Sequence, residues 1–441
     1  MTDRRTFLAH TAGTLGVLAL APSAWGAAHE AARTLTSRLD VALDRLGRPG
    51  PARLADDEAF WAEVREAFDL DATLINLDHG WSNPAPRSAV NDLVSGARSL
   101  EALPSEVLET LWPTVTDTAV RAALAEAMGV PGDQLALVRN ATEALDTVLL
   151  GVPLAPGDEV VCSSHDYYAM LDALEQRQRR DGVVLRWVDL PVPAPSLDAL
   201  AEAYEAALTP RTKLVLLTHP SNLTGQLLPV RRIAEAAHAV GAGVVVDGAQ
   251  SLGLIPESPA DLGADYYGAS LHKWFGAPVG MGVLWMRPEH VETVWPLVPS
   301  PPWVDGMGRF EWIGTSPEYV GPAVLPALAL HATLGPERKA ARLRYLTGYW
   351  RERAAAALPT ARFYSRPDEE MSLGLCTIEL PGLDAEAVKE RLQQEHGLVV
   401  QPMGGLGRTP HIRGVRVSPN VYTTPAELDR LVAALVAVAA S

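Results

Sequence analysis

Lysine is scarce in this chain, and one lysine stands in surroundings suited to covalent chemistry. The sequence contains Lys213, Lys273, Lys339 and Lys389, and its other basic side chains are arginines. Lys273 follows the strand-like segment ADYYG and lies in GASLHKWFG, among small and aromatic residues. Burial there would lower the pKa of the ammonium, and a neutral primary amine forms a Schiff base with a carbonyl, which arginine cannot do. Lys213 begins a strand beside Arg211. Lys339 and Lys389 stand in charge-rich helical segments, so we expect these two to be solvated.

A carboxylate and a helix start complement this amine. Asp247 ends the apolar run GVVVD, and a buried carboxylate needs a cationic partner, although it could instead cap the turn before Gly248. The motif NATEA opens a helix directly after the apolar segment LALVR. Its free N–H groups and its dipole favour a phosphate, which Ala141 and Thr142 would contact, although an ordinary N-cap also explains the motif. Together the three features suit pyridoxal 5′-phosphate (PLP), with Asp247 opposite its protonated ring nitrogen.

An ordered set of motifs extends this hypothesis to most of the chain. NATEA, SSHDYY, HPSNLTG, DGAQ, SLHK and WIGTSP resemble the motifs of class V aminotransferases of PLP fold type I, and most of all the isopenicillin N epimerase-like branch. The resemblance extends from about Ile75 to Thr424. It implies that Lys273 holds the cofactor as a Schiff base and moves protons, and that Asp247 pairs with the ring nitrogen. It also implies a homodimer with shared active sites.

The resemblance assigns further roles by position. Asn222 and Gln250 would hydrogen-bond the phenolic oxygen of the cofactor ring, and either His165 or Tyr167 would stack on that ring. Arg416, in VRVSPNVYTT, would grip a substrate carboxylate with its planar fork, although an arginine on a surface strand is the alternative. The phosphate would be held by Thr142, Ser270, His272 and, from the neighbouring subunit, Thr315.

One stretch departs from the family pattern. The sequence LDHGWSN stands where the family usually has Asn-His-Gly or Asn-Asn-Gly. We expect His79 and Asn83 to contact the substrate, and Asp78 and Trp81 to reshape its pocket. Other tryptophans near the motifs would either line the pocket or pack in the core: Trp274, Trp303 and Trp312.

The reaction itself is left open by the sequence. Cysteine desulfurases share the fold and need a nucleophilic cysteine on the loop before the arginine strand, but the matching stretch GGLGRTPHIRG has none, and Cys162 and Cys376 lie in predicted strands. We therefore expect no desulfurase activity. An epimerase, lyase or aminotransferase would act on an amino acid or small peptide with a free α-carboxylate. The alternatives are an exported PLP-binding protein without turnover and, less favoured, a structural protein with a decayed site.

The elements that must position these residues form an α/β pattern. Apolar runs such as KLVLLT and GVVVD lack alternation, as in strands covered on both faces. They alternate with helical stretches, which predicts an open, mostly parallel sheet flanked by helices, with ligands at the carboxyl ends of its strands. We predict PLP fold type I, with a large domain over 71–320, a smaller α+β domain over 321–441, and a helical segment over 27–70 packed on the small domain or a partner.

The first residues and the overall charge indicate location and partners. Arg4 and Arg5, a short apolar run and an A-x-G site are typical of a twin-arginine signal over residues 1–26, with a mature start near Ala27 and export to the periplasm or beyond. That run is too short to span a bilayer. A net charge of −16 over 441 residues argues against nucleic acid and anionic membranes. Two cysteines are too few for a disulfide scaffold or a cysteine-based metal site.

Overall fold

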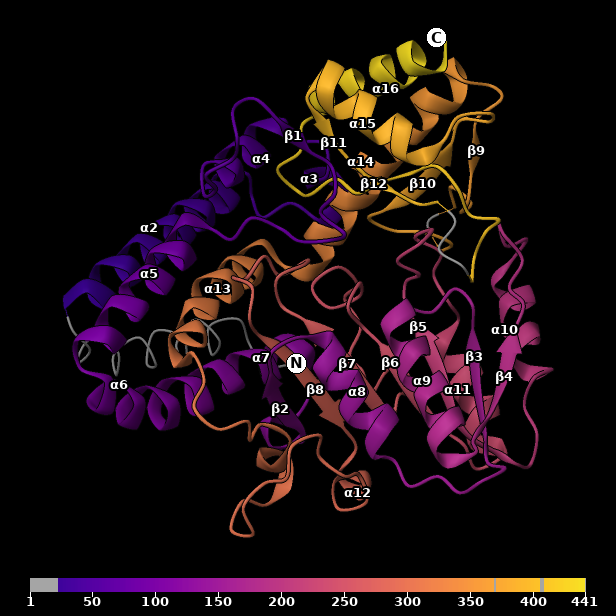
Figure 1. Cartoon of the computed structure of the whole chain (residues 1–441). Coiled ribbons are helices and arrows are strands. Elements are labelled where there is room, and N and C mark those ends of the chain that lie inside the picture. The colour runs from indigo at the N-terminus through magenta and orange to yellow at the C-terminus, as the bar shows by residue number, and fades with distance from the viewer. Residues whose placement is uncertain (1–22, 369, 405–407, 441) are drawn as a thin grey trace.

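The computed structural model describes the chain from residue 23 to residue 440, apart from residue 369 and residues 405–407 (Figure 1). The predicted twin-arginine motif and its apolar run therefore lie outside the described residues. In Figure 1 the chain forms a large part around a seven-stranded sheet, a smaller C-terminal part above it, and N-terminal helices along one side.

The large part is built on one twisted sheet with the strand order β2-β8-β7-β6-β5-β3-β4. Strand β8 runs antiparallel to both of its neighbours, and the other pairs are parallel. The predicted mostly parallel sheet is thus confirmed, and β8 runs antiparallel to β7 because the loop 271–281, which contains no crossover helix, joins the two strands. The strands are β2 (Leu135–Val138), β3 (Glu159–Ser163), β4 (Val184–Val188), β5 (Thr212–Thr218), β6 (Gly243–Asp247), β7 (Tyr266–Ser270) and β8 (Gly282–Met286).

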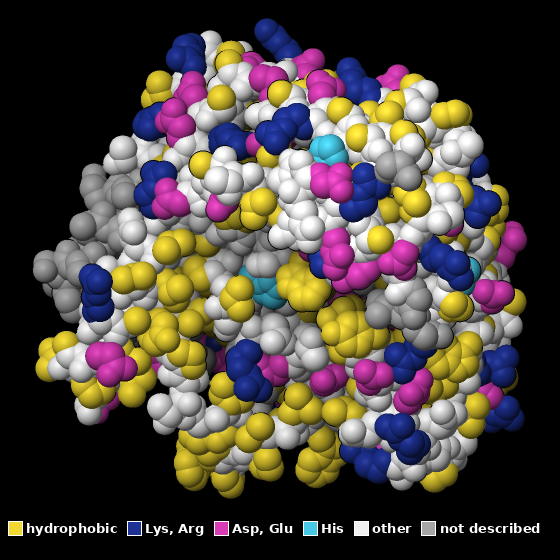
Figure 2. Space-filling view, turned by 45° about the horizontal axis from the view of Figure 1, so that its top comes forward, with side chains coloured by type: hydrophobic (Ala, Val, Ile, Leu, Met, Phe, Trp, Pro, Cys, Tyr) yellow, Lys and Arg dark blue, Asp and Glu magenta, His cyan; other side chains and the backbone are white. Residues whose placement is uncertain are grey.

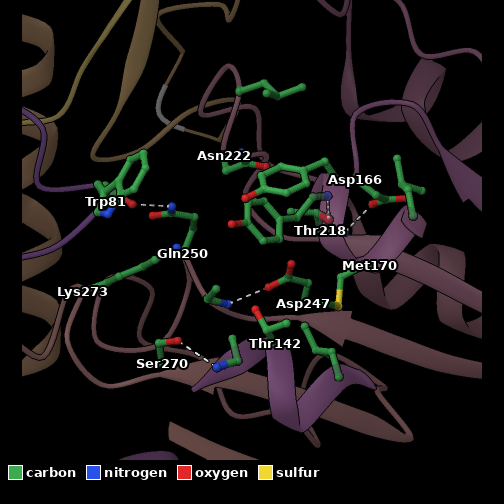
Figure 3. A pocket seen from close by; sticks show the side chains of 18 of the residues that line it. Trp81, Thr142, Asp166, Met170, Thr218, Asn222, Asp247, Gln250, Ser270 and Lys273 are labelled. Atoms are coloured by element: carbon green, nitrogen blue, oxygen red, sulfur yellow. Dashed lines mark hydrogen bonds between the residues drawn. The ribbon is translucent and has the colours of Figure 1, made fainter. Parts of the chain in front are cut away.

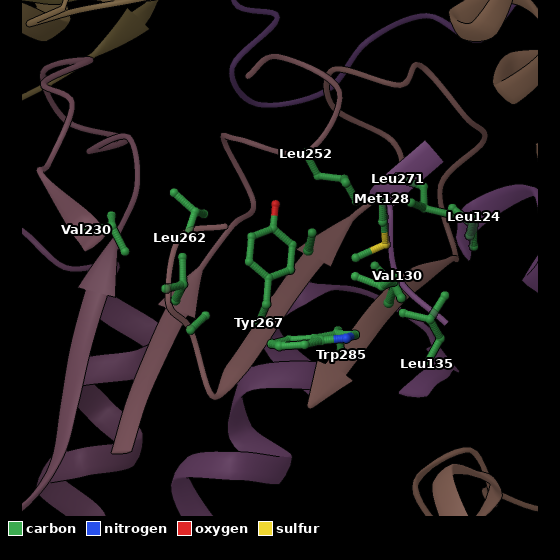
Figure 4. Packing of buried hydrophobic residues seen from close by; sticks show 14 of the residues in the cluster. Leu124, Met128, Val130, Leu135, Val230, Leu252, Leu262, Tyr267, Leu271 and Trp285 are labelled. Carbon is green, nitrogen blue, oxygen red and sulfur yellow. The ribbon is translucent and has the colours of Figure 1, made fainter. Parts of the chain in front are cut away.

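Helices cover both faces of this sheet, which explains its unalternating apolar strands. Leu217 and Val246 belong to a buried cluster on one face, whereas the adjacent Leu216 and Val245 belong to a cluster on the other. In Figure 4 the first cluster packs aliphatic side chains around Tyr267. The helices of the large part are α5 (Arg87–Ala102), α6 (Pro104–Leu111), α7 (Arg121–Met128), α8 (Ala141–Gly151), α9 (Tyr168–Asp181), α10 (Leu197–Glu205), α11 (Val230–Ala239), α12 (Pro288–Val291) and α13 (Leu325–Leu334).

The C-terminal part is a four-stranded antiparallel sheet with the order β12-β13-β10-β9, packed against three helices. Gly335, with φ of 84°, separates α13 from α14 as the sequence predicted. The elements are α14 (Pro336–Ala357), β9 (Arg362–Phe363), β10 (Cys376–Glu379), α15 (Ala385–His396), β12 (Gln401–Pro402), β13 (Val415–Val417) and α16 (Pro425–Ala439).

Two N-terminal segments join this C-terminal part. Strand β1 (Ile75–Asn76) pairs with β11 (Leu398–Val399), although the predicted boundary at residue 71 placed β1 with the large domain. The helices α2 (Ser23–Arg45), α3 (Pro51–Leu54) and α4 (Glu58–Arg65) pack against α13 and α14 through a shared buried cluster. Among the described residues, no helix is long and apolar enough to cross a bilayer, and no cluster of side chains suits a metal ion.

Candidate active site

A cavity of about 530 Å³ lies where the carboxyl ends of the central strands face the C-terminal part. Its wall combines loops after β5, β6 and β7, the start of α8, and residues near β12 and β13. In the space-filling view, apolar side chains border a hollow near the centre of the face (Figure 2). Figure 3 shows that Lys273, Asp247, Thr142 and Ser270 approach one common space from different elements.

Lys273 lies on the loop between the antiparallel strands β7 and β8, and its side chain reaches the cavity wall. Burial lowers the pKa of its ammonium to about 8, while the charge of Asp247 acts in the opposite direction and that of Arg416 lowers it further. The side-chain amide of Asn83 donates to the backbone carbonyl of Lys273, and the Asn83 backbone N–H donates to the His272 carbonyl at 2.9 Å. The fold thus holds an amine that loses its proton readily.

Asp247 ends strand β6, and its carboxylate is buried at the base of the same cavity. Its Oδ1 accepts the backbone N–H of Ala249 at 3.0 Å. Burial raises the pKa of Asp247, against that hydrogen bond and the charge of Lys273. The following residue must be glycine, because a Cβ at Gly248 would lie 2.0 Å from Cζ of Tyr267. A buried carboxylate on the wall of a cavity is suited to a cationic ligand group.

The start of α8 forms an anion site on the opposite wall. Asn140 caps the helix by accepting the N–H of Glu143 at 2.9 Å, and Ser270 Oγ accepts the N–H of Ala141 at 2.8 Å. The hydroxyl proton of Ser270 therefore remains available to a ligand. Thr142 lines the cavity, and the buried Nδ1 of His272 has no hydrogen-bond partner in the described structure. These unfilled groups around a helix N-terminus fit a phosphate.

Two residues predicted to meet the cofactor's phenolic oxygen lie on the cavity wall. The buried Oδ1 of Asn222 has no hydrogen-bond partner among the described residues. Gln250 is already held at both ends, since its Nε2 donates to the Gly80 carbonyl at 2.7 Å and its Oε1 accepts Trp274 Nε1 at 2.9 Å. The free Oδ1 of Asn222 can only accept a hydrogen bond, whereas Gln250 has its second amide proton left to donate to a ligand.

The structure separates the two candidates for stacking on a flat ring. Tyr167 lines the main cavity, beside Tyr168, with 4.5 Å between their ring centroids. His165 lies instead on the wall of a separate small cavity, where its Nε2 is 3.3 Å from Nε2 of His411. Burial lowers the pKa of His165 to about 4. Of the two candidates, only Tyr167 lies on the wall of the main cavity, and its stacking on the cofactor ring stays a prediction.

Arg416 on β13 is buried, with 3% of its surface exposed, so it is not the surface arginine considered as an alternative. It lies on the cavity wall. Its Nη2 donates to Oδ1 of Asp78 at 2.7 Å, and its Nη1 donates to the Asn222 carbonyl at 2.8 Å. Its buried Nε has no partner in the described structure.

Two residues expected to touch the substrate do not line the main cavity. His79 faces a neighbouring cavity beside Tyr422, and burial lowers its pKa to about 3. Asn83 is buried and binds the Lys273 loop and Asn420. The Asn83 side chain holds the loop that carries Lys273, whereas the His79 ring lies against Asn76 and Tyr422. Because neither side chain is on the wall of the main cavity, their contact with the substrate stays a prediction. Thr315 is exposed and outside the cavity of its own subunit, so its role in a partner's site stays a prediction.

Other expectations about single residues also change. Lys339 was expected to be solvated, but it is 4% exposed, because α14 turns that face toward α13 and the loop after Lys273. Trp303 and Trp312 are 80% and 43% exposed, so they neither line the cavity nor pack in the core. Trp81, by contrast, does line the cavity, as expected for a residue that reshapes the pocket.

Sequence reasoning missed several wall residues. Asp166 is buried, accepts the backbone N–H groups of Ser163 and Thr218, and has a pKa that burial raises to about 7. Its position in SSHDYY, directly after a buried strand, was a usable signal. Tyr168, Met170 and Leu171 follow Asp166 in the same segment. Further missed wall residues come from other segments and had no local signal, among them Leu145, Gln401, Met403 and Arg408.

Comparison with known proteins agrees with this geometry. The family model "Aminotransferase class-V" matches residues 114–431. An isopenicillin N epimerase of Streptomyces clavuligerus is 33% identical over 86% of this chain and 98% of that protein, and one of Amycolatopsis lactamdurans is 31% identical over 85% and 98%. A probable cysteine desulfurase of Mycolicibacterium paratuberculosis is 37% identical over 42% of this chain and 26% of that protein.

Solved structures share the same fold. A C-DES variant with glycine covalently linked to its PLP cofactor has a TM-score of 0.76 at 22% identity, over 84% of this chain and 98% of that one. The cysteine desulfurase CsdA from Escherichia coli has a TM-score of 0.72 at 23% identity, over 85% and 97%. The predicted fold type I is therefore confirmed. The amine, the buried carboxylate and the anion site occupy one cavity in a fold that holds PLP.

Proposed function

Because the chain belongs to the class V aminotransferase family and is a PLP-dependent enzyme, we propose that it makes and breaks bonds at the α-carbon of an amino acid or small peptide. Proton exchange at that carbon, as in an epimerase, is the favoured reaction. The observation that carries the proposal is the position of Lys273, whose amine has a pKa lowered to about 8 and lies on the same cavity wall as Asp247. The isopenicillin N epimerases match 86% and 85% of this chain and 98% of their own length, which supports this choice among epimerase, lyase and aminotransferase.

Each residue then has a task that its position permits. The N-terminus of α8, with Thr142, Ser270 and His272, holds the phosphate. Asp247 would place a carboxylate opposite the ring nitrogen, and Tyr167 would lie against one face of the ring. When bound, PLP would supply the electron sink that makes a proton at the α-carbon acidic. Lys273 Nζ would hold the cofactor and would take up and return that proton.

Desulfurase activity is not part of the proposal, despite the related cysteine desulfurases. Such chemistry needs an accessible thiolate. Cys162 and Cys376 are both fully buried, in clusters on the sheet and in the C-terminal part. Burial also raises the pKa of the Cys162 thiol far above its usual value. A lyase that cleaves a carbon–sulfur bond without its own cysteine remains within the proposed reaction class.

We also propose that the enzyme works as a homodimer in which Thr315 reaches the partner's phosphate. The exposed Thr315 lies in a segment that presents Trp295, Trp303 and Trp312 to solvent, at 70%, 80% and 43% exposure. Large exposed apolar side chains are typical of contact surfaces. Sedimentation velocity would test this: we expect a dimer, and a monomer with full cofactor affinity would contradict it.

Export by the twin-arginine route is likewise a proposal, and it rests on Arg4, Arg5 and the short apolar run that follows. We expect cell fractionation of a natural host to find the shortened protein outside the cytoplasm. Uncleaved protein confined to the cytoplasm would contradict export without affecting the proposed chemistry.

Chemical trapping tests the central proposal. Borohydride reduction of the PLP-loaded enzyme, followed by peptide mapping, should place the cofactor on Lys273 and on no other lysine. The same enzyme in D₂O should exchange the α-proton of at least one member of a panel of amino acids and small peptides, as read by NMR. A label on another lysine, or none, would overturn the assignment of Lys273. No exchange with any member would overturn the epimerase-like reaction.

A further inference from the structure

The guanidinium expected to grip a substrate carboxylate already has a carboxylate partner. Arg416 Nη2 is 2.7 Å from Asp78 Oδ1, with the two side chains 4% and 12% exposed. Arg416 Nη1 donates to the Asn222 carbonyl at 2.8 Å. The two charged residues are 338 positions apart in the chain, so the fold alone makes this pair.

Asp78 neutralises Arg416 from behind the cavity wall. Arg416 and Gly80 line the cavity, whereas Asp78 does not. The backbone around Gly80 lies flat against the guanidinium, since a Cβ there would be 3.2 Å from Arg416 Cζ and 3.3 Å from its Nη2. Seen from a ligand in the cavity, the negative charge of Asp78 lies just behind the positive charge of Arg416. The two charges partly cancel, so the net attraction of this wall for an anion is reduced.

The unfilled hydrogen-bonding capacity at Arg416 suits an uncharged acceptor. Its Nε is buried without a partner in the described structure, and a single carbonyl oxygen would satisfy that donor. A carboxylate would satisfy it too, but would add a second buried negative charge to a cation that Asp78 already balances.

The other arginine on the cavity wall is neutralised in the same way. Arg408 Nη2 lies 2.7 Å from both Asp172 Oδ1 and Glu175 Oε1 of α9. Much of the remaining wall beside these arginines is apolar or aromatic, with Trp81 and Met170 among its residues. Within the described part of the wall, neither arginine is left as an unpaired cation for a substrate anion.

We propose that Asp78 is a specificity-determining residue: by balancing Arg416, it lets the site accept α-amino amides, including the first residue of a peptide, without requiring a free α-carboxylate. The inference rests on the proposed function, because it names the substrate class for chemistry at the α-carbon. The site then does not select strictly for amino acids. It also accepts compounds that have a free amino group and a derivatised carboxyl group.

A matched pair of probes tests this on the PLP-loaded enzyme. Leucine and leucinamide differ only at the carboxyl group, and their dissociation constants, expressed per free amine, follow from the cofactor absorbance and from the shift in melting temperature. A hydrogen bond to a charged group contributes about 1.5–3 kcal/mol, which is about tenfold or more in affinity. An unopposed guanidinium should therefore prefer leucine by about tenfold or more. We expect the natural enzyme to prefer it by less than about tenfold.

The variant Asp78→Asn keeps the shape and an acceptor for Arg416 but removes the charge. It should raise the preference for leucine over leucinamide by about tenfold and increase the melting-temperature shift caused by leucine. The matched control is Glu58→Gln, which removes the charge from a carboxylate paired with the buried Arg342 outside the cavity. It should leave the preference unchanged.

Several outcomes would overturn the proposal. These are a natural enzyme that prefers leucine by about tenfold or more, one that responds to leucine alone or to neither probe, and an Asp78→Asn variant with an unchanged or lower preference. If that variant does not fold, the measurement on the natural enzyme decides. The cofactor label on Lys273 is independent of Asp78, so a failure here with Lys273 labelled leaves the proposed chemistry intact.

Discussion

Lys339 is buried and Lys273 is partly exposed in the cavity wall, and the pKa of both amines is lowered. Burial lowers the pKa of Lys273 to about 8 and that of Lys339 to about 7. Lys339 Nζ donates to the Trp274 carbonyl at 2.7 Å and to His331 Nδ1 at 3.0 Å. Lys273 lies on the cavity wall near the charge of Asp247, whereas Lys339 does not line that cavity.

The comparison shows that a low pKa does not by itself identify a catalytic lysine. Desolvation produces it at any buried amine, including one whose donors serve the protein. Access to a cavity and a nearby carboxylate separate Lys273 from Lys339. The two are also connected, because Lys339 binds the carbonyl of Trp274, the residue after Lys273, and so helps to hold the catalytic loop.

The largest expected difference is in turnover. Lys273→Met should abolish covalent attachment of the cofactor and lower the rate of α-proton exchange by about 10²–10⁴, the usual contribution of a positioned acid–base group. Lys339→Met should keep the covalent cofactor, because its amine does not reach the cavity. Absorbance spectra and exchange rates measured by NMR would check both. Loss of the covalent cofactor in Lys339→Met alone would reverse the assignment.

The next difference concerns stability and pH. Between pH 7 and pH 10 the unfolded chain keeps the proton of Lys339, whose ordinary pKa is 10.5, while the folded chain loses it near 7. The unfolded state then binds more protons, so the free energy of unfolding rises with pH, by up to about 1.4 kcal/mol per pH unit. Urea unfolding at several pH values should show a slope that is smaller by this amount in Lys339→Met. Equal slopes would mean that Lys339 titrates normally.

A smaller effect is expected at a fixed pH of 7. Lys339→Met retains an unbranched side chain but leaves the Trp274 carbonyl and His331 Nδ1 without their donor. An unsatisfied buried acceptor costs about 1–3 kcal/mol, so we expect a loss of stability in this range by urea unfolding. A variant as stable as the natural protein would show that the free-energy cost of burying Lys339 is as large as the stabilisation from its hydrogen bonds.

The smallest effect is expected at a lysine on the surface. Lys213 is exposed at the start of β5. Lys213→Met should change the free energy of unfolding by less than about 0.5 kcal/mol and leave proton exchange unaltered. A larger change would contradict the view that its high exposure separates Lys213 from Lys273 and Lys339.

Much of the fold and the centre of the site follow from local sequence. Runs such as GVVVD predicted buried strands. Residues at the end of such a run, or just after it, predicted the edge of the cavity, as at Asp247 and at Ala141, where α8 begins. These features are readable because strand burial and helix capping depend on residues close together in the chain. Lys273 was found because its neighbours are uncharged.

The remaining features depend on which distant segments meet. Lys339 stands in a charge-rich helical segment, and only the packing of α14 against α13 and the Lys273 loop buries it. That His165 lies outside the main cavity became visible only in the fold, which places it beside His411, 246 residues away in the chain. Likewise, the ion pair between Arg65 and Glu427 joins residues that are 362 positions apart.

By itself, therefore, the sequence determined the strands, the amine of Lys273, the carboxylate of Asp247 and the helix start at Ala141, because each is encoded within a few neighbouring residues. Only the tertiary structure decided that Arg416 pairs with Asp78, that Asn83 holds the Lys273 loop, and that Lys339 is buried. Charge balance and burial depend on what lies across a cavity or behind its wall, and no pattern along a single segment records them.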